Sequence, residues 1–248
     1  METPLRLDIL TQPDDTTCGP TCLHAIYGFY GDTLPLDTVV TEAHSLKEGG
    51  TLDVFLANHA LRRGYEATIY TYNLQVFDPT WFSRPGIDLA QRLHAQLAHK
   101  HRPKLAVATS GYLEFLRLGG SIRFENLTTA LIRRYLKRST PILTGLSATY
   151  LYGSAREFGP KSDYDDLRGE PTGHFVVLCS YEPETRRVLI ADPLEKNPVS
   201  GTHHYEVDID RVLCAILLGI VTYDANLLVI EPVSRRHHKP NVRPDHRT

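Results

Sequence analysis

The chain has 248 residues, of which 42% are hydrophobic, and this is enough for one large domain or two small ones with a packed core. Its 27 Lys and Arg residues nearly balance its 29 Asp and Glu residues, at a pI near 6.6, which argues against binding of nucleic acid or anionic membranes through net charge. No apolar run approaches the roughly 20 residues of a membrane helix, and the first ten residues lack the features of a secretory signal. We therefore expect a cytoplasmic protein without membrane insertion, although export by a signal-independent route stays compatible with the sequence.

The first half of the chain has mainly helical patterns. Pro20 suits the first turn of a helix that Gly31 ends, while Thr51 and Asn126 are expected to cap later helices. The region 65–74 is rich in β-branched and aromatic residues and is expected to be a strand, whereas 104–120 favours neither structure. Apolar spacing predicts helices over 18–30, 34–44, 49–65, 86–101 and 126–138.

The second half changes to short β-branched and apolar runs bounded by turn residues. One amphipathic helix is expected over 207–219, with Asp208 near its start. The remaining runs predict strands over 141–152, 173–182, 186–193 and 225–232. This order, helices first and a mostly antiparallel sheet second, indicates an α+β fold. We expect a single domain over 1–232, followed by a disordered basic tail over 233–248 that contains almost no apolar side chains.

Three of the four cysteines fit ordinary structural positions. Cys22, Cys179 and Cys214 lie in apolar runs, where free buried thiols are common, so a disulfide framework is not expected. Cys18 is different because it opens the predicted helix over 18–30. A helix N-terminus carries partial positive charge and stabilises a thiolate, and Gly19 allows a substrate to approach the backbone closely. Cys18 is therefore a candidate nucleophile, although a lone cysteine in this position is more often an inert turn residue.

A reactive thiol needs a base, and His174 is the candidate. It opens the strand over 173–182 after a polar loop, and a water-exposed histidine is the alternative interpretation. Asp192 ends the next strand, and an antiparallel hairpin would place that end beside the start of the first strand. Asp192 can therefore orient the His174 imidazole, although an Asp-Pro pair is also an ordinary strand terminator.

Gln12 lies six residues before Cys18. Acyl transfer creates an oxyanion that preorganised donors must stabilise, and a glutamine amide with the Cys18 backbone N–H is suited to this. We therefore expect Gln12 to contribute an oxyanion hole.

The segment Gln12 to Leu23 (QPDDTTCGPTCL), with GHFVVL at 173–178 and IADP at 190–193, resembles the bacteriocin-processing double-glycine peptidases. These bacterial enzymes belong to the papain-like cysteine peptidases, and the likeness extends over roughly 5–232, with 75–140 matching only as generic helices. The resemblance implies a papain-like fold and a Cys-His-Asp triad with a Gln oxyanion hole, in Cys18, His174, Asp192 and Gln12. It implies a peptide or protein substrate and needs no cofactor or metal.

The chain departs from that family at several points. Family members are commonly fused to an ABC transporter, and none is present here, which weakens the case for leader-peptide cleavage. Thr17 stands where the family often has an acidic residue, and 75–140 together with the loop 153–173 lengthens the gap between nucleophile and base. We expect these added segments to reshape the cleft.

Several alternatives remain open from the sequence. The same triad could deamidate a glutamine or transfer an acyl group to an amine, or the fold could bind peptides without turnover. A zinc site formed by Cys18, Cys22, His203 and His204 lacks the usual short ligand spacing. The acidic run 163–166 is expected to be a solvated loop. The sequence does not indicate an oligomeric state.

Overall fold

The computed structural model describes residues 7–46 and 49–233, so most of the predicted tail lies outside the described residues. The helices are α1 (Cys18–Phe29), α2 (Leu36–Glu42), α3 (Asp53–Arg62), α4 (Leu89–Leu97), α5 (Pro103–Arg117), α6 (Thr129–Leu136), α7 (Ala148–Tyr152) and α8 (Ile209–Leu218), with 3-10 helices η1 (Pro79–Trp81) and η2 (Gly219–Thr222). The strands are β1 (Tyr65–Thr71), β2 (Ser121–Arg123), β3 (Ile142–Ser147), β4 (Glu157–Phe158), β5 (Asp163–Tyr164), β6 (Gly173–Glu182), β7 (Arg187–Ala191), β8 (His204–Asp208) and β9 (Asn226–Pro232).

Seven of these strands form one sheet in the order β2-β1-β9-β3-β6-β7-β8. The pairing of β1 with β2 is parallel, and every other neighbouring pair of this sheet is antiparallel. The short strands β4 and β5 form a separate hairpin in the loop that leads to β6. The predicted α+β class, with a mostly antiparallel sheet, is confirmed.

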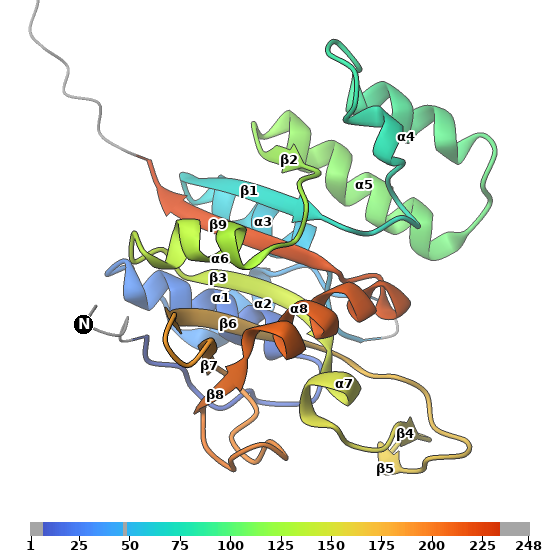
Figure 1. The fold of residues 1–248 in the computed structure, drawn as a ribbon. Coiled ribbons are helices and arrows are strands. Elements are labelled where there is room, and N and C mark those ends of the chain that lie inside the picture. Colours follow the sequence, from blue (N-terminus) through green and yellow to red (C-terminus); the bar gives the residue numbers. More distant parts are fainter. Residues whose placement is uncertain (1–6, 47–48, 234–248) are drawn as a thin grey trace, which may run out of the picture.

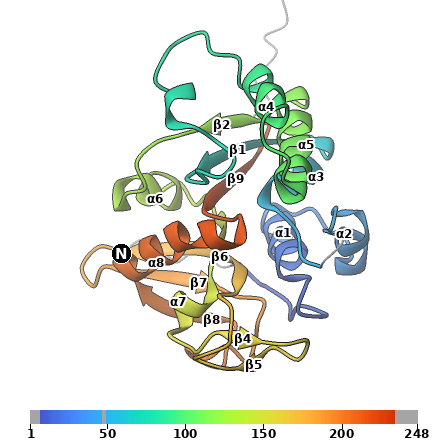
Figure 2. The same cartoon turned by 90° about the vertical axis from the view of Figure 1, so that its right-hand side faces the viewer.

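Helices cover both faces of the sheet, as Figures 1 and 2 show: α1 and α3 lie on one face, and α6 and α8 on the other. Side chains alternate between the two resulting cores because successive residues of a strand point to opposite faces. In β1, Ile69 enters the core beneath α1 and α3, whereas Tyr70 enters the core beneath α6 and α8. Helix α1 is seated on β6, where the Cys22 thiol donates to the Phe175 carbonyl at 3.3 Å.

One end of the central strands positions the candidate site. Ser147, the last residue of β3, pairs with Gly173, the first residue of β6, and Gly145 pairs with Asn226 at the start of β9. The end of one strand therefore meets the starts of two others. This end of the sheet carries His174, and Cys18 at the start of α1 lies near enough to raise the pKa of His174.

The structure corrects three predictions of local structure. The run 141–152 is not one strand, because Ser147 ends β3 and caps α7 by accepting from the Tyr150 N–H at 3.3 Å. Thr51 does not cap α3, where Leu52 holds the cap position without a side-chain hydrogen bond. Asn126 does not cap α6 either, since Thr128 accepts from the Leu131 N–H instead.

Other differences concern elements and side chains that the sequence left undecided or misplaced. Most of 104–120 is helical, in α5, and β8 was not expected. All four cysteines are free, as predicted, but Cys214 is exposed on α8 rather than buried. The start of α8 is as expected, because the Asp208 side chain accepts from the Asp210 N–H at 2.8 Å.

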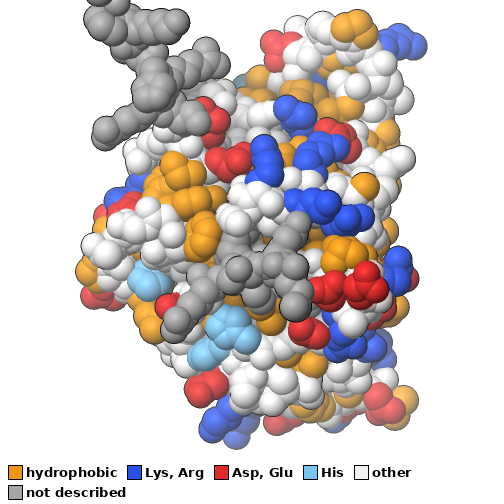
Figure 3. All heavy atoms as spheres, turned by 60° about the vertical axis from the view of Figure 1, so that its left-hand side comes forward, with side chains coloured by type: hydrophobic (Ala, Val, Ile, Leu, Met, Phe, Trp, Pro, Cys, Tyr) orange, Lys and Arg blue, Asp and Glu red, His pale blue; other side chains and the backbone are white. Residues whose placement is uncertain are grey.

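The surface carries both signs of charge. On the face in Figure 3, basic and acidic side chains lie close to one another. Among the described helices, none is long and apolar enough to cross a bilayer. The single domain over 1–232 stays a prediction.

Candidate active site

Cys18 is the first residue of α1, and a tight turn precedes it. The Asp14 carboxylate accepts both the N–H and the hydroxyl of Thr16 at 2.8 Å, and these hydrogen bonds lower the pKa of Asp14. The Thr17 hydroxyl donates to the Asp14 carbonyl at 3.0 Å. The turn is thus held by its own side chains, and it places a cysteine at the positive end of α1.

His174 lies between Cys18 and Asp192. Its Nε2 atom is 2.8 Å from Asp192 Oδ1, and the nearby Cys18 side chain contributes to the raised pKa of the His174 ring. Because Nε2 is taken by the carboxylate, Nδ1 is the nitrogen left to face the thiol. The three residues are nearly inaccessible to solvent, with exposed fractions of 9% for Cys18, 7% for His174 and 0% for Asp192.

The charges of this group favour a protonated histidine. Burial alone disfavours the charged imidazole, but the interactions of the ring with the Asp192 carboxylate and the Cys18 side chain outweigh that effect and raise the pKa of His174. Burial likewise opposes ionisation of Asp192, yet the charge of His174 and the hydrogen bonds to the carboxylate lower the pKa of Asp192. The raised pKa of His174 and the lowered pKa of Asp192 both favour the charged pair, an imidazolium beside a carboxylate.

Asp192 accepts hydrogen bonds from three further donors that the sequence did not reveal. The Tyr152 and Tyr205 hydroxyls donate to its Oδ2 at 2.8 and 2.6 Å, and the Leu194 N–H donates to Oδ1 at 2.8 Å. Tyr152 lies in α7 and Tyr205 in β8, two of the elements that the sequence patterns did not predict. No local signal could have found them, since only the packing of α7 and β8 brings both hydroxyls to Asp192.

Gln12 belongs to the same region through its backbone and its amide. Its N–H donates to the carbonyl of Pro193, the neighbour of Asp192, at 3.1 Å. Its side-chain Nε2 donates to the Asp14 carbonyl at 2.9 Å, within the turn that leads to Cys18. A primary amide has two hydrogens on nitrogen, so one of them remains for another acceptor.

The residues weighed as zinc ligands have other partners. The Cys22 thiol donates to the Phe175 carbonyl, His203 Nδ1 is 2.7 Å from the Asp192 carbonyl, and His204 Nε2 is 2.9 Å from the Leu7 carbonyl. Within 7–46 and 49–233, no group of three or more His, Cys, Asp or Glu residues is arranged to hold a metal ion.

Two further buried carboxylates, Asp53 and Asp224, lie on the same side of the sheet as α3. The sequence analysis did not identify them. Burial raises the pKa of each to about 7, and the charge of Asp224 also raises that of Asp53. Glycines leave room for Asp224, because a Cβ on Gly145 or Gly173 would lie 2.8 or 2.7 Å from its carboxylate oxygens. Asp224 therefore lies against the residue that precedes His174.

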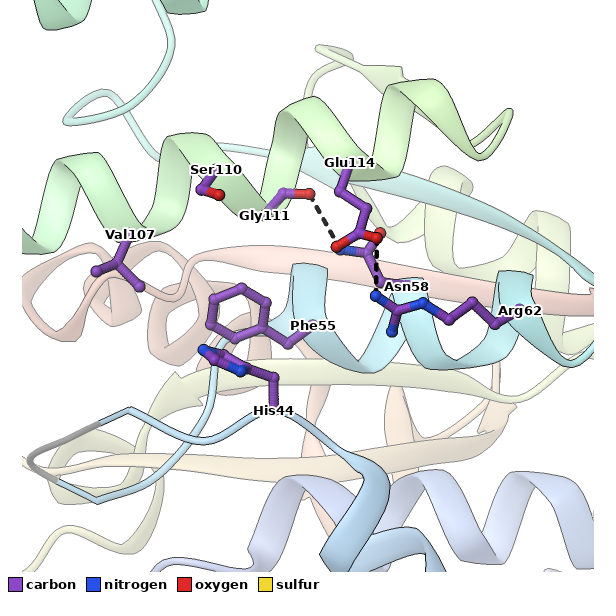
Figure 4. A pocket seen from close by; sticks show the side chains of 8 residues that line it. All are labelled: His44, Phe55, Asn58, Arg62, Val107, Ser110, Gly111 and Glu114. Atoms are coloured by element: carbon purple, nitrogen blue, oxygen red, sulfur yellow. Dashed lines mark hydrogen bonds and ion pairs between the residues drawn. The ribbon is translucent and has the colours of Figure 1, made fainter.

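A pocket of about 280 Å³ lies between α3 and α5, away from these groups (Figure 4). At one end the His44 and Phe55 rings pack edge to face, with their centroids 4.4 Å apart. At the other end an Arg62 guanidinium nitrogen lies 2.8 Å from Glu114 Oε1. Asn58 donates to the Gly111 carbonyl across it at 3.0 Å. None of the candidate catalytic residues lines this pocket.

Comparisons with known proteins agree with this architecture. The model of the Peptidase_C39-like family matches residues 4–212, whereas no curated protein matches the chain. A protein described as a C39-like peptidase from Bacillus anthracis is 13% identical, with a TM-score of 0.50 over 93% of this chain and 98% of that one. At this identity the likeness shows the fold alone.

Two further solved structures are similar at lower scores. Xylellain, a cysteine protease from Xylella fastidiosa, is 15% identical, with a TM-score of 0.46 over 93% of this chain and 84% of that one. A double glycine motif protease from an AMS/PCAT transporter, solved in complex with the leader peptide, is 12% identical, with a TM-score of 0.44 over 94% of this chain and 96% of that one.

Proposed function

This chain belongs to the Peptidase_C39-like family and is a cysteine peptidase, and on that premise we propose that Cys18 is its nucleophile. In this proposal His174 is the general base and acid, Asp192 orients His174, and Gln12 contributes the oxyanion hole. The substrate is a peptide or protein, and the reaction needs no cofactor.

The chemistry follows from the positions of the protons. The Cys18 proton passes to His174 Nδ1, and the thiolate sulfur attacks the carbonyl carbon of the scissile amide. The carbonyl oxygen becomes an oxyanion, which the second hydrogen of the Gln12 amide and the Cys18 backbone N–H stabilise. The imidazolium then protonates the leaving amine, and a thioester links the acyl group to Cys18.

Deacylation reverses the same roles. His174 removes a proton from water, the resulting hydroxide attacks the thioester carbonyl, and the thiolate leaves as the carboxylic acid forms. Asp192 keeps Nδ1 turned toward the reacting atoms in both half-reactions.

The observation that supports this proposal is the hydrogen bond between Asp192 and His174, with the Cys18 side chain near the same imidazole. His174 Nε2 lies 2.8 Å from Asp192 Oδ1, and Cys18 at the start of α1 is close enough to raise the pKa of the same ring. A histidine with one nitrogen on a carboxylate and the other on a thiol is suited to move a proton between that thiol and a substrate.

A peptide mixture tests the proposal over many substrate sequences at once. The purified protein is incubated with peptides from a digested proteome, and mass spectrometry searches for new termini. Cys18→Ala should abolish the new termini, whereas Cys214→Ala, which changes an exposed thiol on α8, should leave them intact. Undiminished cleavage by the Cys18→Ala variant would overturn the assignment.

The same experiment separates hydrolysis from the other reactions of such a triad. Hydrolysis of a backbone amide splits a peptide, whereas deamidation adds about one dalton to an intact one, and transfer to an amine joins two molecules. Only split products support the peptidase reaction.

A further inference from the structure

The Asp192 carboxylate has all of its acceptor positions filled. Oδ1 accepts from His174 and from the Leu194 N–H, and Oδ2 accepts from the Tyr152 and Tyr205 hydroxyls. A carboxylate offers about four lone-pair sites, so no further donor is needed. A rotation of the carboxyl group would break several of these hydrogen bonds at once.

The two tyrosines hold Oδ2 from different parts of the fold. Tyr205 lies in β8, where it pairs with Ile190 of β7, two residues before Asp192. Tyr152 is the last residue of α7, and its ring lies 6.1 Å from that of His174, measured between centroids. Strand β8 and helix α7 therefore each supply a hydroxyl that donates to Asp192 Oδ2.

Both hydroxyls keep their protons. Burial raises the pKa of Tyr152 and of Tyr205 well above the ordinary value, and the negative charge of Asp192 raises each further. Each hydroxyl has a single hydrogen, and each gives it to Asp192 Oδ2. They are therefore permanent donors to this carboxylate.

We propose that Tyr152 and Tyr205 are positioning residues, which fix Asp192 against His174 and limit how tightly Asp192 holds the imidazole proton. The inference rests on the proposed function, because it assigns these hydroxyls to the same Cys18-His174-Asp192 group.

The direction of the effect follows from electrostatics. A hydroxyl directed at Asp192 stabilises its negative charge most when His174 is neutral, since an adjacent imidazolium already offsets that charge. Removal of a hydroxyl therefore favours the imidazolium, and His174 should hold its proton to higher pH. A general acid that releases its proton less readily is a poorer catalyst near neutral pH.

The test is a titration of the His174 ring by NMR in protein with labelled histidines. The Cys18→Ala background removes the thiolate from the titration, and comparison with His174→Ala assigns the signal among the 12 histidines. Tyr205→Phe and Tyr152→Phe are each added to this background. Tyr135→Phe is the matched control, because Tyr135 is also buried and its hydroxyl lies 2.6 Å from that of Tyr70, without contact to Asp192.

Each Asp192-facing variant should raise the titration midpoint of His174 by about half a unit or more, and the control should leave it unchanged. An unchanged or lowered midpoint in folded Tyr205→Phe and Tyr152→Phe proteins would overturn the inference. If one variant fails to fold, the other decides the question. The result is independent of turnover, since failure of the proposed function would appear as cleavage that survives Cys18→Ala.

Discussion

Asp192 and Asp53 are both buried carboxylates, yet their surroundings shift their pKa values in opposite directions. Burial opposes ionisation in both, but His174 and the hydrogen bonds from the Tyr205 hydroxyl and the Leu194 N–H lower the pKa of Asp192. Asp53 faces another carboxylate, Asp224, and one of its oxygens lacks a hydrogen-bond partner within the described residues. The pKa of Asp53 is consequently raised to about 7.

These shifts predict opposite contributions to stability. The raised His174 pKa and the lowered Asp192 pKa mean that their pair stabilises the folded chain at mildly acidic pH. That contribution is lost as the pH rises through the folded pKa of His174 or falls through that of Asp192. Asp53 instead destabilises the fold as the pH rises from its unfolded pKa, near 3.8, to about 7.

Asp53→Asn is therefore expected to stabilise the protein at alkaline pH. Asparagine removes the cost of burying a charge, so the free energy of unfolding should rise by about 4 kcal/mol at pH 8 and change little near pH 4. Urea unfolding at both pH values measures the difference. Asp166→Asn, at an exposed position, is the control, and an equal gain at both pH values would contradict the buried-charge explanation.

At the scale of elements, close approach of α3 and α5 depends on a glycine. A Cβ on Gly111 would lie 2.7 Å from the Phe55 ring and 2.8 Å from a Val54 methyl carbon. Both neighbours belong to the buried core, so they have little room to move.

Gly111→Ala should therefore separate the two helices and lower the free energy of unfolding by about 1–3 kcal/mol. Gly28→Ala is the matched comparison, since Gly28 is also within a helix but has no atom within 4 Å of an added Cβ. That variant should gain about 0.5–1 kcal/mol, because alanine favours helix. Chemical denaturation compares them, and equal stability of the two variants would refute the packing argument.

The sequence predicted most elements but misjudged their boundaries where tertiary packing decides. Cys18, His174 and Asp192 were proposed from positions at helix and strand ends. In the structure His174 hydrogen bonds to Asp192 and Cys18 is close enough to raise the pKa of His174, while their catalytic roles stay a prediction. The run after Ser147 has strand-like β-branched and aromatic residues, yet it turns into α7 because Ser147 caps a helix there. Propensity alone could not show this, and so Tyr152 was not foreseen as a partner of Asp192.

At the scale of the whole molecule, both cores depend on the single seven-stranded sheet, with helices on each face. The last strand, β9, lies between β1 and β3 in this sheet and ends at Pro232. The domain boundary after residue 232 stays a prediction of the sequence.

Truncation after Val233 tests that boundary. The sequence-based boundary predicts that removal of residues 234–248 leaves the thermal midpoint within about 2 °C, because the folded core retains all its strands. Calorimetry of the two proteins provides the comparison. A fall of about 5 °C or more would show that the terminal residues belong to the folded unit.

The most direct test of the central claim, that Cys18 and His174 act as a pair, needs no substrate. The protein is alkylated with iodoacetamide from about pH 4 to about pH 9, and peptide mass spectrometry follows Cys18, with the exposed Cys214 as an internal reference. Cys18 should react at lower pH than Cys214 and lose that advantage in the His174→Ala variant. If Cys18 reacts no more readily than Cys214, with or without His174, the proposed catalytic pair does not exist.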